Sequence, residues 1–463
     1  MARARVAILG GGLAGLAAAL RLGESGYEVE LFEKRPVLGG RASSFVPPGE
    51  TVPIDNCQHV LLGCCTNLLD FFRRAGVADR FRFYNRYVFM GAGNASTLGA
   101  APLPAPLHLL PSLLRFRGLG WGDRWAIVRA MWTILRTPSP LPDEPLLAWL
   151  ERHGQSAAAR ENFWRVILTS ALNEDLERLS TRAAFHVFLD AFLRNRRGYR
   201  MGVPTVPLSE LYSGRMLGEK CVLRLATPVV GVNVTGHRFQ SLRLQDGEEK
   251  ASDYLVSALP CDAFSNLLSE EQRAHWPEMP HWTALEWSPI TGIHLWFDRP
   301  VMDLDHVTVF GRTIQWVFNK SAVASGNATS ANHQYIQLVI SASRSLMTLR
   351  REEVLELVLR ELAEILPRSK EAQLQRAVVV KETKATLSFP PGFDSQRPGP
   401  DTPFANLFLA GDWTATGWPP TMESAVRSGY RAAERVTEAA GKPEKFLVPD
   451  LPVDPLARLL QRS

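Results

Sequence analysis

The stretch Val6–Gly15, which reads VAILGGGLAG, decides the fold of this chain. Its first four residues form a short apolar run that is typical of a buried parallel strand. The glycines have the spacing of a dinucleotide-binding turn. In such a turn Gly10 permits the tight bend, Gly12 lets a diphosphate approach the backbone, and Gly15 lets the next helix pack closely on the strand.

A helix-forming run, Leu16–Leu22, follows the turn directly. Leu13 and Ala14, in the turn just before this helix, belong to the same candidate cofactor site. The free N–H groups at the helix start and the positive end of the helix dipole favour a bound diphosphate.

A second predicted strand, Val29–Phe32, ends at an acidic residue, Glu33. Glu33 follows the third glycine at roughly the 20-residue spacing at which a carboxylate binds ribose hydroxyls and disfavours NADP. Lys34, the next residue, belongs to the same candidate site. A further glycine pair ending at Gly40 lets the chain pass close to the cofactor, and Arg41 places a planar donor group beside the phosphates.

The composite of Gly10–Glu33 and Gly39–Arg41 resembles the amine oxidase and phytoene desaturase superfamily of FAD enzymes. The resemblance implies FAD as the cofactor. It also implies an α/β fold, in which a Rossmann-like FAD-binding domain is interleaved with a mixed-sheet and helical substrate domain.

Members of this superfamily complete the flavin site with a C-terminal Gly-Asp segment and a following helix. Here the resemblance assigns Gly411 and Asp412 to the ribityl or phosphate side of FAD. A helix that begins near Thr421 and Met422 would direct a backbone N–H towards the flavin N1 and O2 edge, where reduced flavin carries negative charge. Val229 would contact the adenine through its backbone.

The segment Asp55–Gly63, which reads DNCQHVLLG, resembles the squalene-associated FAD-dependent desaturases, now understood as hydroxysqualene dehydroxylases. The resemblance places Gln58 and His59 beside the cofactor. This chain departs from the family at Cys57, where glycine is usual, and the extra side chain is expected to narrow the space beside the isoalloxazine.

This second resemblance implies that the protein removes the allylic hydroxyl of 12-hydroxysqualene by reduction and yields squalene, in hopanoid or isoprenoid synthesis. The alternatives are a carotenoid-type desaturase or amine oxidase, which would use the flavin in the oxidative direction, and a non-catalytic prenyl-binding escort. We expect a hydrophobic isoprenoid substrate. An electron donor is also required, but with only one dinucleotide fingerprint the sequence does not identify it.

Three polar residues are candidates for the catalytic chemistry. His59 could protonate the leaving hydroxyl, or it could only hold its own loop in place. Asn173 and Gln315 could orient the hydroxyl, or they could bond the backbone, as side-chain amides usually do.

We predict a discontinuous FAD-binding domain formed by residues 1–62, 211–262 and 375–440. Residues 63–210 and 263–374 would form the substrate-binding domain, and 441–463 a C-terminal tail.

Several functions are unsupported. The 463-residue chain has a net charge of only +5, with no basic block interleaved with aromatics, so we expect no nucleic-acid partner. The ten histidines are scattered without ligand spacing, which argues against a metal. No apolar run reaches about 18 residues, which argues against a membrane-spanning helix. The odd number of cysteines, five, is typical of free thiols in a reducing compartment, so we expect a cytoplasmic protein.

A helix predicted over residues 123–137 leaves two interpretations open. Its predicted apolar face contains two tryptophans together with Val128, Met131 and Leu135, and its arginines lie mostly off that face. This basic helix could lie on the cytoplasmic face of a membrane, near the entrance for a lipid, or the same face could pack into the substrate domain.

Overall fold

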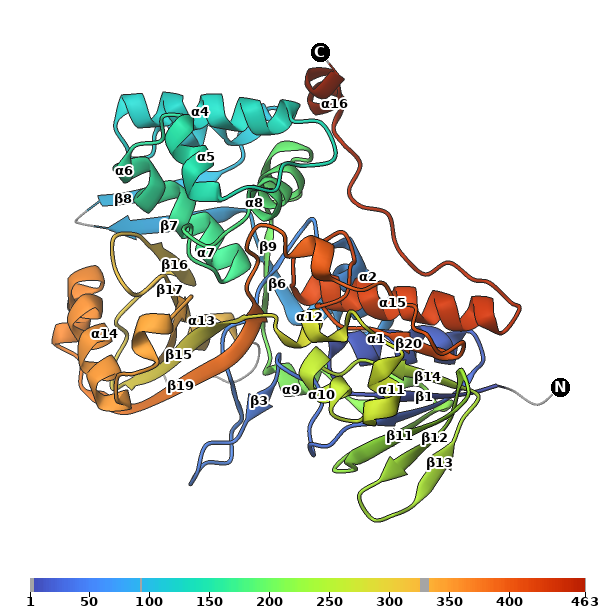
Figure 1. The fold of residues 1–463 in the computed structure, drawn as a ribbon. Helices are drawn as coiled ribbons and strands as arrows, with labels where there is room; N and C mark the ends of the chain where they lie inside the picture. Colours follow the sequence, from blue (N-terminus) through green and yellow to red (C-terminus); the bar gives the residue numbers. More distant parts are fainter. Residues whose placement is uncertain (1–3, 92–93, 325–332, 463) are drawn as a thin grey trace.

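The computed structural model describes residues 4–91, 94–324 and 333–462. Figure 1 shows the parallel sheet of the predicted nucleotide-binding domain on one side of the molecule and a larger mixed sheet on the other. The parallel sheet has five strands, in the order β10 (Cys221–Arg224), β2 (Glu28–Phe32), β1 (Arg5–Leu9), β14 (Tyr254–Ser257) and β20 (Leu407–Leu409). The expected strands 6–9 and 29–32 are therefore confirmed, each one residue longer at its start.

Two helices pack against one another beside this sheet: α1 (Leu13–Glu24), which follows the glycine turn, and α15 (Met422–Ala439). Gly429 permits their close approach, because a Cβ at that position would lie 2.2 Å from the carbonyl oxygen of Ala14. The N-terminal turn and the C-terminal helix thus belong to one packed unit.

The mixed sheet has seven strands, in the order β19 (Leu374–Leu387), β15 (Trp287–Phe297), β18 (Gln334–Ser341), β17 (Trp316–Asn319), β16 (His306–Val309), β7 (Arg86–Gly91) and β8 (Asn94–Gly99). All neighbours are antiparallel except β16 and β7. Helix α14 (Arg351–Ile365) packs its buried Val354, Val358 and Leu362 against this sheet.

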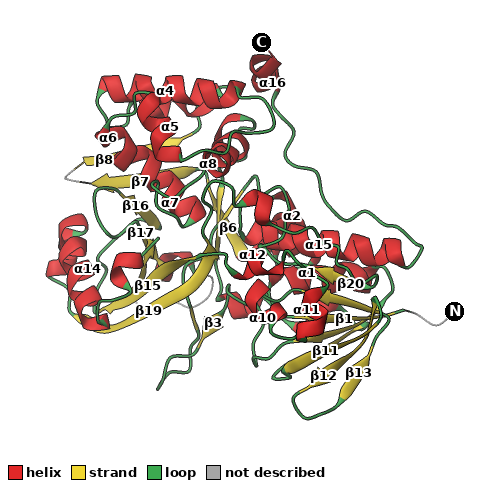
Figure 2. Cartoon of the chain, in the orientation of Figure 1, coloured by secondary structure: helices red, strands yellow, loops and turns green. Residues whose placement is uncertain are grey.

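A helical lobe covers one end of the mixed sheet, and Figure 2 shows most of its helices gathered there. It comprises α3 (Leu110–Leu114), α4 (Trp121–Arg136), α5 (Leu146–Arg152), α6 (Ala157–Ala159), the π-helical turn η3 (Arg160–Arg165), α7 (Val166–Leu172), α8 (Thr181–Val187) and the π-helical turn η4 (Phe188–Leu193). Its core contains the fully buried Trp164. The ring of Trp164 packs edge-on against that of Phe188, with 4.9 Å between the ring centres.

Shorter elements connect these layers. The helices are α2 (Thr66–Arg74), α9 (Leu208–Leu211), α10 (Cys261–Ser265), α11 (Glu270–Ala274), α12 (Met279–Thr283), α13 (Lys320–Val323) and α16 (Pro455–Arg462). The strands are β3 (Ser44–Phe45), β4 (Ile54–Asp55), β5 (Leu61–Leu62), β6 (Phe81–Tyr84), β9 (Met201–Pro204) and the three-stranded sheet β11 (Val229–Thr235), β12 (Arg238–Leu244) and β13 (Glu249–Ala251).

The five parallel strands come from the three chain segments predicted for the FAD-binding domain. One boundary differs. Strand β19 was expected in that domain as the start of 375–440, but it pairs with β15 along almost its whole length, so residues 374–387 lie in the seven-stranded sheet. The predicted tail, described as far as Arg462, runs back across the molecule and ends in α16 against α4.

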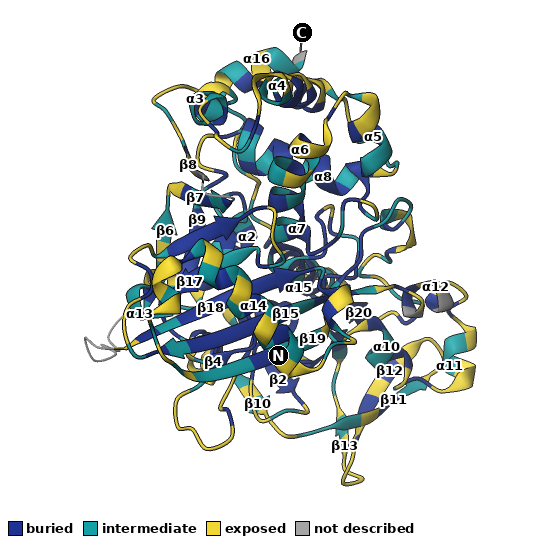
Figure 3. Ribbon diagram, turned by 90° about the vertical axis from the view of Figure 1, so that its left-hand side faces the viewer, coloured by how far each residue is buried: buried dark blue, intermediate teal, exposed yellow. Residues whose placement is uncertain are grey.

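Helix α4 exists where a helix was predicted, and its tryptophans do not pack into the substrate domain, which was one of the two interpretations left open. The buried side chains are Ala126, Ile127, Ala130, Ile134 and Leu135, whereas Trp125 and Trp132 are exposed. The small alanines let the helix approach the lobe beneath it more closely than indoles would. Figure 3 shows exposed stretches along α4 and α16 at this end of the molecule. No helix among the described residues is long and apolar enough to cross a membrane.

Candidate functional site: a dinucleotide cradle

The three fingerprint glycines are required for different reasons. Gly10 has φ +99°, and a Cβ on Gly15 would lie 2.0 Å from the carbonyl oxygen of Gly10, so protein packing alone demands glycine at both positions. At Gly12 an added Cβ would meet only the Cα of Gly40, at 3.7 Å. The protein therefore leaves space above Gly12, and packing alone does not require glycine there, whereas a diphosphate lying against the backbone would.

The start of α1 offers unpaired backbone donors. Gly12 is the N-cap, no side chain caps the helix within the described chain, and the first turn contains no acid. The first hydrogen bond within the helix runs from the N–H of Leu16 to the carbonyl of Gly12 at 2.9 Å. The N–H groups of Leu13, Ala14 and Gly15 are therefore available to an anion.

Glu33 lies at the end of β2, beside the glycine turn. Its buried carboxylate accepts hydrogen bonds from the N–H groups of Gly11 at 2.8 Å and Arg35 at 2.9 Å. Arg35, which sequence reasoning missed, also donates to the carbonyl of Gly40 at 2.6 Å. The Lys34 side chain is exposed.

Val229 begins β11, close to the end of β2. The N–H of Thr227 donates to the carbonyl oxygen of Glu33 at 3.0 Å, which holds the approach to Val229 beside this acid. The backbone of Val229 is therefore near the end of the cradle where Glu33 would hold the ribose.

Arg41 connects the two sequence-distant halves of the site. Its guanidinium forms an ion pair with the buried carboxylate of Asp412, donates to the carbonyl of Ala385 at 3.2 Å, and lies 5.3 Å from the ring centre of Trp287. Gly411, with φ +130°, allows the sharp turn before Asp412. The predicted phosphate and ribityl residues are thus brought together.

The C-terminal helix begins as predicted. Thr421 is the N-cap of α15, and its hydroxyl accepts from the N–H of Ser424 at 3.4 Å. The N–H of Met422 lies in the first turn, where a helix offers no internal acceptor. The neighbouring Glu423 turns away, since its buried carboxylate accepts from the N–H of Leu68 at 2.7 Å and pairs with Arg427.

Arg397 organises the loop between Asp412 and α15. Its fully buried guanidinium donates to the carbonyls of Asp412 at 2.8 Å and Trp418 at 2.7 Å and pairs with Asp394. Sequence reasoning missed it because the surrounding Gln396–Pro398 stretch carries no periodicity.

The Asp55–His59 segment is tied both to the cradle and to the mixed sheet. Asn56 donates to the carbonyl of Arg41 at 2.8 Å. Lys320, which sequence reasoning also missed, donates to Asp55 at 3.3 Å and to the Gln58 side chain at 2.9 Å. These contacts position Gln58 and the following histidine.

His59 is half-buried, and its Nδ1 lies 3.0 Å from the carbonyl oxygen of Cys57. A carbonyl can only accept, so Nδ1 carries the proton and Nε2 presents a lone pair. Nε2 has no hydrogen-bond partner within the described part of the chain. Burial lowers the pKa of His59, so the neutral form dominates at neutral pH.

Cys57 packs into the protein core. Its Cβ lies 3.8 Å from the position that a Cβ on Gly292 of β15 would occupy. Burial raises the pKa of its thiol to about 12, so the thiol stays protonated. The narrowing of the flavin space by this side chain remains a prediction.

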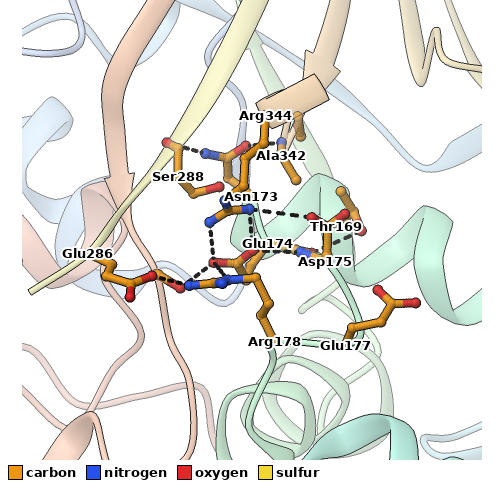
Figure 4. Close-up of polar contacts among 12 residues, drawn as sticks. Thr169, Asn173, Glu174, Asp175, Glu177, Arg178, Glu286, Ser288, Ala342 and Arg344 are labelled. Atoms are coloured by element: carbon orange, nitrogen blue, oxygen red, sulfur yellow. Dashed lines mark hydrogen bonds and ion pairs between the residues drawn. The ribbon is translucent and has the colours of Figure 1, made fainter. Parts of the chain in front are cut away.

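Figure 4 shows Asn173 with both ends of its amide engaged. The residue ends α7 at φ +52°, donates to Ser288 O at 3.0 Å and Thr386 Oγ1 at 2.8 Å, and accepts from the N–H of Ala342 at 2.7 Å. Beside it the buried Glu174 binds Arg344 at 2.6 and 2.8 Å. This network fastens the helical lobe to the mixed sheet.

Gln315 exchanges two hydrogen bonds with the backbone of Ser341, at 3.2 and 2.9 Å. For both Asn173 and Gln315, the geometry favours hydrogen bonding to the protein backbone. Their orientation of a substrate hydroxyl stays a prediction. Among the described residues no group of three acidic, histidine or cysteine side chains could hold a metal ion.

The donor set fits a dinucleotide: free N–H groups at the start of α1, space above Gly12, an acid beside the turn, and a second helix start at Met422. The model of the flavin containing amine oxidoreductase family matches residues 13–437, and the chain belongs to that family. The protein is an FAD-dependent oxidoreductase.

The relatives have different activities. The chain is 28% identical over 454 residues to the hydroxysqualene dehydroxylase of Rhodopseudomonas palustris, covering 94% of this chain and 99% of that protein. It is 26% identical over 461 residues to the 15-cis-phytoene desaturase of Synechococcus elongatus, covering 93% of this chain and 95% of that protein. An oxidoreductase from Methanosarcina mazei shares the fold, with a TM-score of 0.71 at 18% identity over 92% of this chain and 98% of that one.

Proposed function

We propose that this flavoenzyme removes the allylic hydroxyl of 12-hydroxysqualene by reduction and releases squalene. The full-length similarity to hydroxysqualene dehydroxylases supports this substrate, as does the Asp55–Gly63 segment. In the balanced reaction the carbon–oxygen bond breaks, one proton and the hydroxyl leave as water, and a hydride takes the vacated carbon. Bound reduced FAD supplies that hydride.

The observation that carries the proposal is the state of His59: a half-buried imidazole with an unpaired Nε2, three residues beyond the Asn56 contact to Arg41. Its neighbours are apolar, since Cys57 is part of a hydrophobic core cluster and Val60 packs against that cluster. An imidazole with a free nitrogen beside these apolar side chains suits a long hydrocarbon with one hydroxyl.

Neutral His59 accepts a hydrogen bond from the substrate hydroxyl and so orients it. Protonated His59 donates to the same oxygen and assists its departure as water. Because burial lowers the pKa of this histidine, the donating form grows as pH falls. Lys320 holds the segment through Asp55 and Gln58, and the Asp55 carboxylate offsets its charge.

The test is an anaerobic single turnover of reduced enzyme with 12-hydroxysqualene. Squalene should form in step with flavin reoxidation, and His59→Ala should slow this step by about 10²–10⁴-fold while the FAD content stays normal. His237→Ala is the matched control, since His237 is exposed on the β11–β12 turn. Unchanged hydroxysqualene would refute the proposed reaction, and a fast His59→Ala enzyme would refute only the role of His59.

The second candidate is oxidative desaturation of a carotenoid, favoured by the similarity to 15-cis-phytoene and zeta-carotene desaturases over 93–94% of this chain. This activity would bleach the oxidised flavin anaerobically when phytoene is added. Amine oxidation is less well supported, because the ring of Trp418 is enclosed by His186 and Arg427 and so is poorly placed as a wall of an amine cage.

A further inference from the structure

Helix α4 presents an unusual outward face. Its exposed residues include Trp121, Trp125, Arg129, Trp132 and Arg136, at intervals of three or four residues. At about 100° per residue these five positions fall within an arc of about 80°. The stripe opposite the buried alanines therefore consists of indoles and guanidinium groups.

The tryptophans are the most exposed large apolar side chains of this lobe: 64% of Trp121, 55% of Trp125 and 45% of Trp132 is accessible. Arginine side chains lie against two of the rings. The guanidinium carbon of Arg124 lies 4.7 Å from the ring centre of Trp121, and that of Arg136 lies 5.4 Å from the ring centre of Trp132. Exposed indoles in such number are uncommon on a soluble surface and mark an interaction site.

The charge of this region is one-sided. Residues 101–139 contain five arginines, at positions 115, 117, 124, 129 and 136, and a single acid, Asp123, whereas the whole chain has a net charge of only +5. The carboxylate of Asp123 is engaged by the N–H of Gly120 at 2.9 Å and by the hydroxyl of Ser156 at 2.6 Å. The exposed charge around α4 is therefore positive.

The patch continues onto neighbouring elements. Helix α16 contacts α4, and its Leu459 is 64% exposed. Figures 1 and 3 both place α4 and α16 side by side at the end of the molecule opposite β11–β13. The tail thus adds an apolar residue to this end without covering the tryptophans.

We infer that the outward face of α4, together with α16, docks on the surface of an anionic lipid bilayer. Tryptophan and arginine on one helix face are the side chains that settle at the headgroup level, the indole in the apolar boundary and the guanidinium among the phosphates. A second copy of this chain fits less well, because a symmetric contact would bring two arginine-rich faces together. The inference rests on this surface alone and goes beyond the proposed reaction.

The test is flotation of the FAD-loaded enzyme with vesicles of equal parts phosphatidylglycerol and phosphatidylcholine, and separately with pure phosphatidylcholine vesicles. The enzyme should bind the anionic vesicles and bind less as salt is added. The triple variant Trp121→Ala, Trp125→Ala, Trp132→Ala should lower the affinity about tenfold or more. The pair Arg129→Glu and Arg136→Glu should lower it about 10- to 30-fold at low salt.

The matched control is Val52→Ala with Val222→Ala, which truncates exposed apolar side chains on the FAD-binding side and should leave binding unchanged. All variants should retain FAD, since the altered side chains are exposed. Failure of the native enzyme to float, or equal flotation of the triple tryptophan variant, would overturn the inference. So would self-association that depends on these tryptophans without vesicle binding, which would identify a second copy as the occupant.

Discussion

Replacing Gly12 by alanine separates cofactor binding from folding. The backbone of Gly12 has φ −77° and ψ 177°, which any residue adopts, and an added Cβ would touch only Gly40 Cα at 3.7 Å. Losing the glycine N-cap destabilises α1 by up to about 1 kcal/mol, and reduced freedom of the unfolded chain returns about 0.4–1 kcal/mol. We therefore expect the stability of the FAD-free protein to change by less than about 1 kcal/mol.

The same methyl group occupies the space above the turn where the diphosphate would meet the N–H groups of Leu13, Ala14 and Gly15. Displacing the diphosphate far enough to break one charge-assisted hydrogen bond costs about 1.5–3 kcal/mol, so the dissociation constant for FAD should rise roughly 10- to 150-fold.

Gly15→Ala is the matched comparison. Its Cβ would lie 2.0 Å from Gly10 O, which should destabilise the protein by about 3 kcal/mol or more even without FAD. Flavin fluorescence titration would measure the affinity, and urea unfolding of the FAD-free protein its stability. A Gly12→Ala protein that binds FAD as tightly as the native protein would refute the assignment of Gly12 to the cofactor site.

Three further expectations test the site. Glu33→Gln should weaken FAD binding by roughly 1.5–3 kcal/mol in the same titration. The control Glu28→Gln changes an exposed residue of the same strand and should bind FAD as the native protein does. If Glu33→Gln also bound FAD as tightly as the native protein, Glu33 would not belong to the site. The single-turnover rate should rise as pH falls and should level off below a kinetic pKa that is lower than the usual 6.5 of histidine. The His59→Ala variant should lack this pH dependence. A rate that rises with pH in the native enzyme would contradict a proton-donating His59. NADPH alone should leave the flavin oxidised in an anaerobic spectrum, and rapid bleaching would show that a second nucleotide site exists.

The glycine cradle could be predicted from sequence because its chemistry is local. A strand, a turn, a helix start and an acid follow one another within residues 6–33, and the turn requirements of Gly10 and Gly15 appear directly in the backbone. The start of α15 at Thr421 was predictable for the same reason.

The missed features depend on contacts between distant parts of the chain. Lys320 meets Asp55 across 265 positions of sequence, and Arg397 acts through backbone carbonyls that leave no trace in the sequence. The pairing of β19 with β15 moved a domain boundary by the same kind of long-range contact. The sequence left open which face of α4 is buried, because hydrophobicity favours burying tryptophan, whereas close packing favours the smaller alanine.

The most direct test of the proposed reaction follows a hydride that does not exchange with water. The enzyme would be loaded with 5-deaza-FAD reduced with deuterium at C5 and incubated anaerobically with 12-hydroxysqualene, and the lipid products would be examined by mass spectrometry and NMR. The proposal predicts squalene with one deuterium at the former carbinol carbon. Recovery of unlabelled hydroxysqualene, from an enzyme whose oxidised FAD form is bleached by phytoene, would contradict it and identify a desaturase instead.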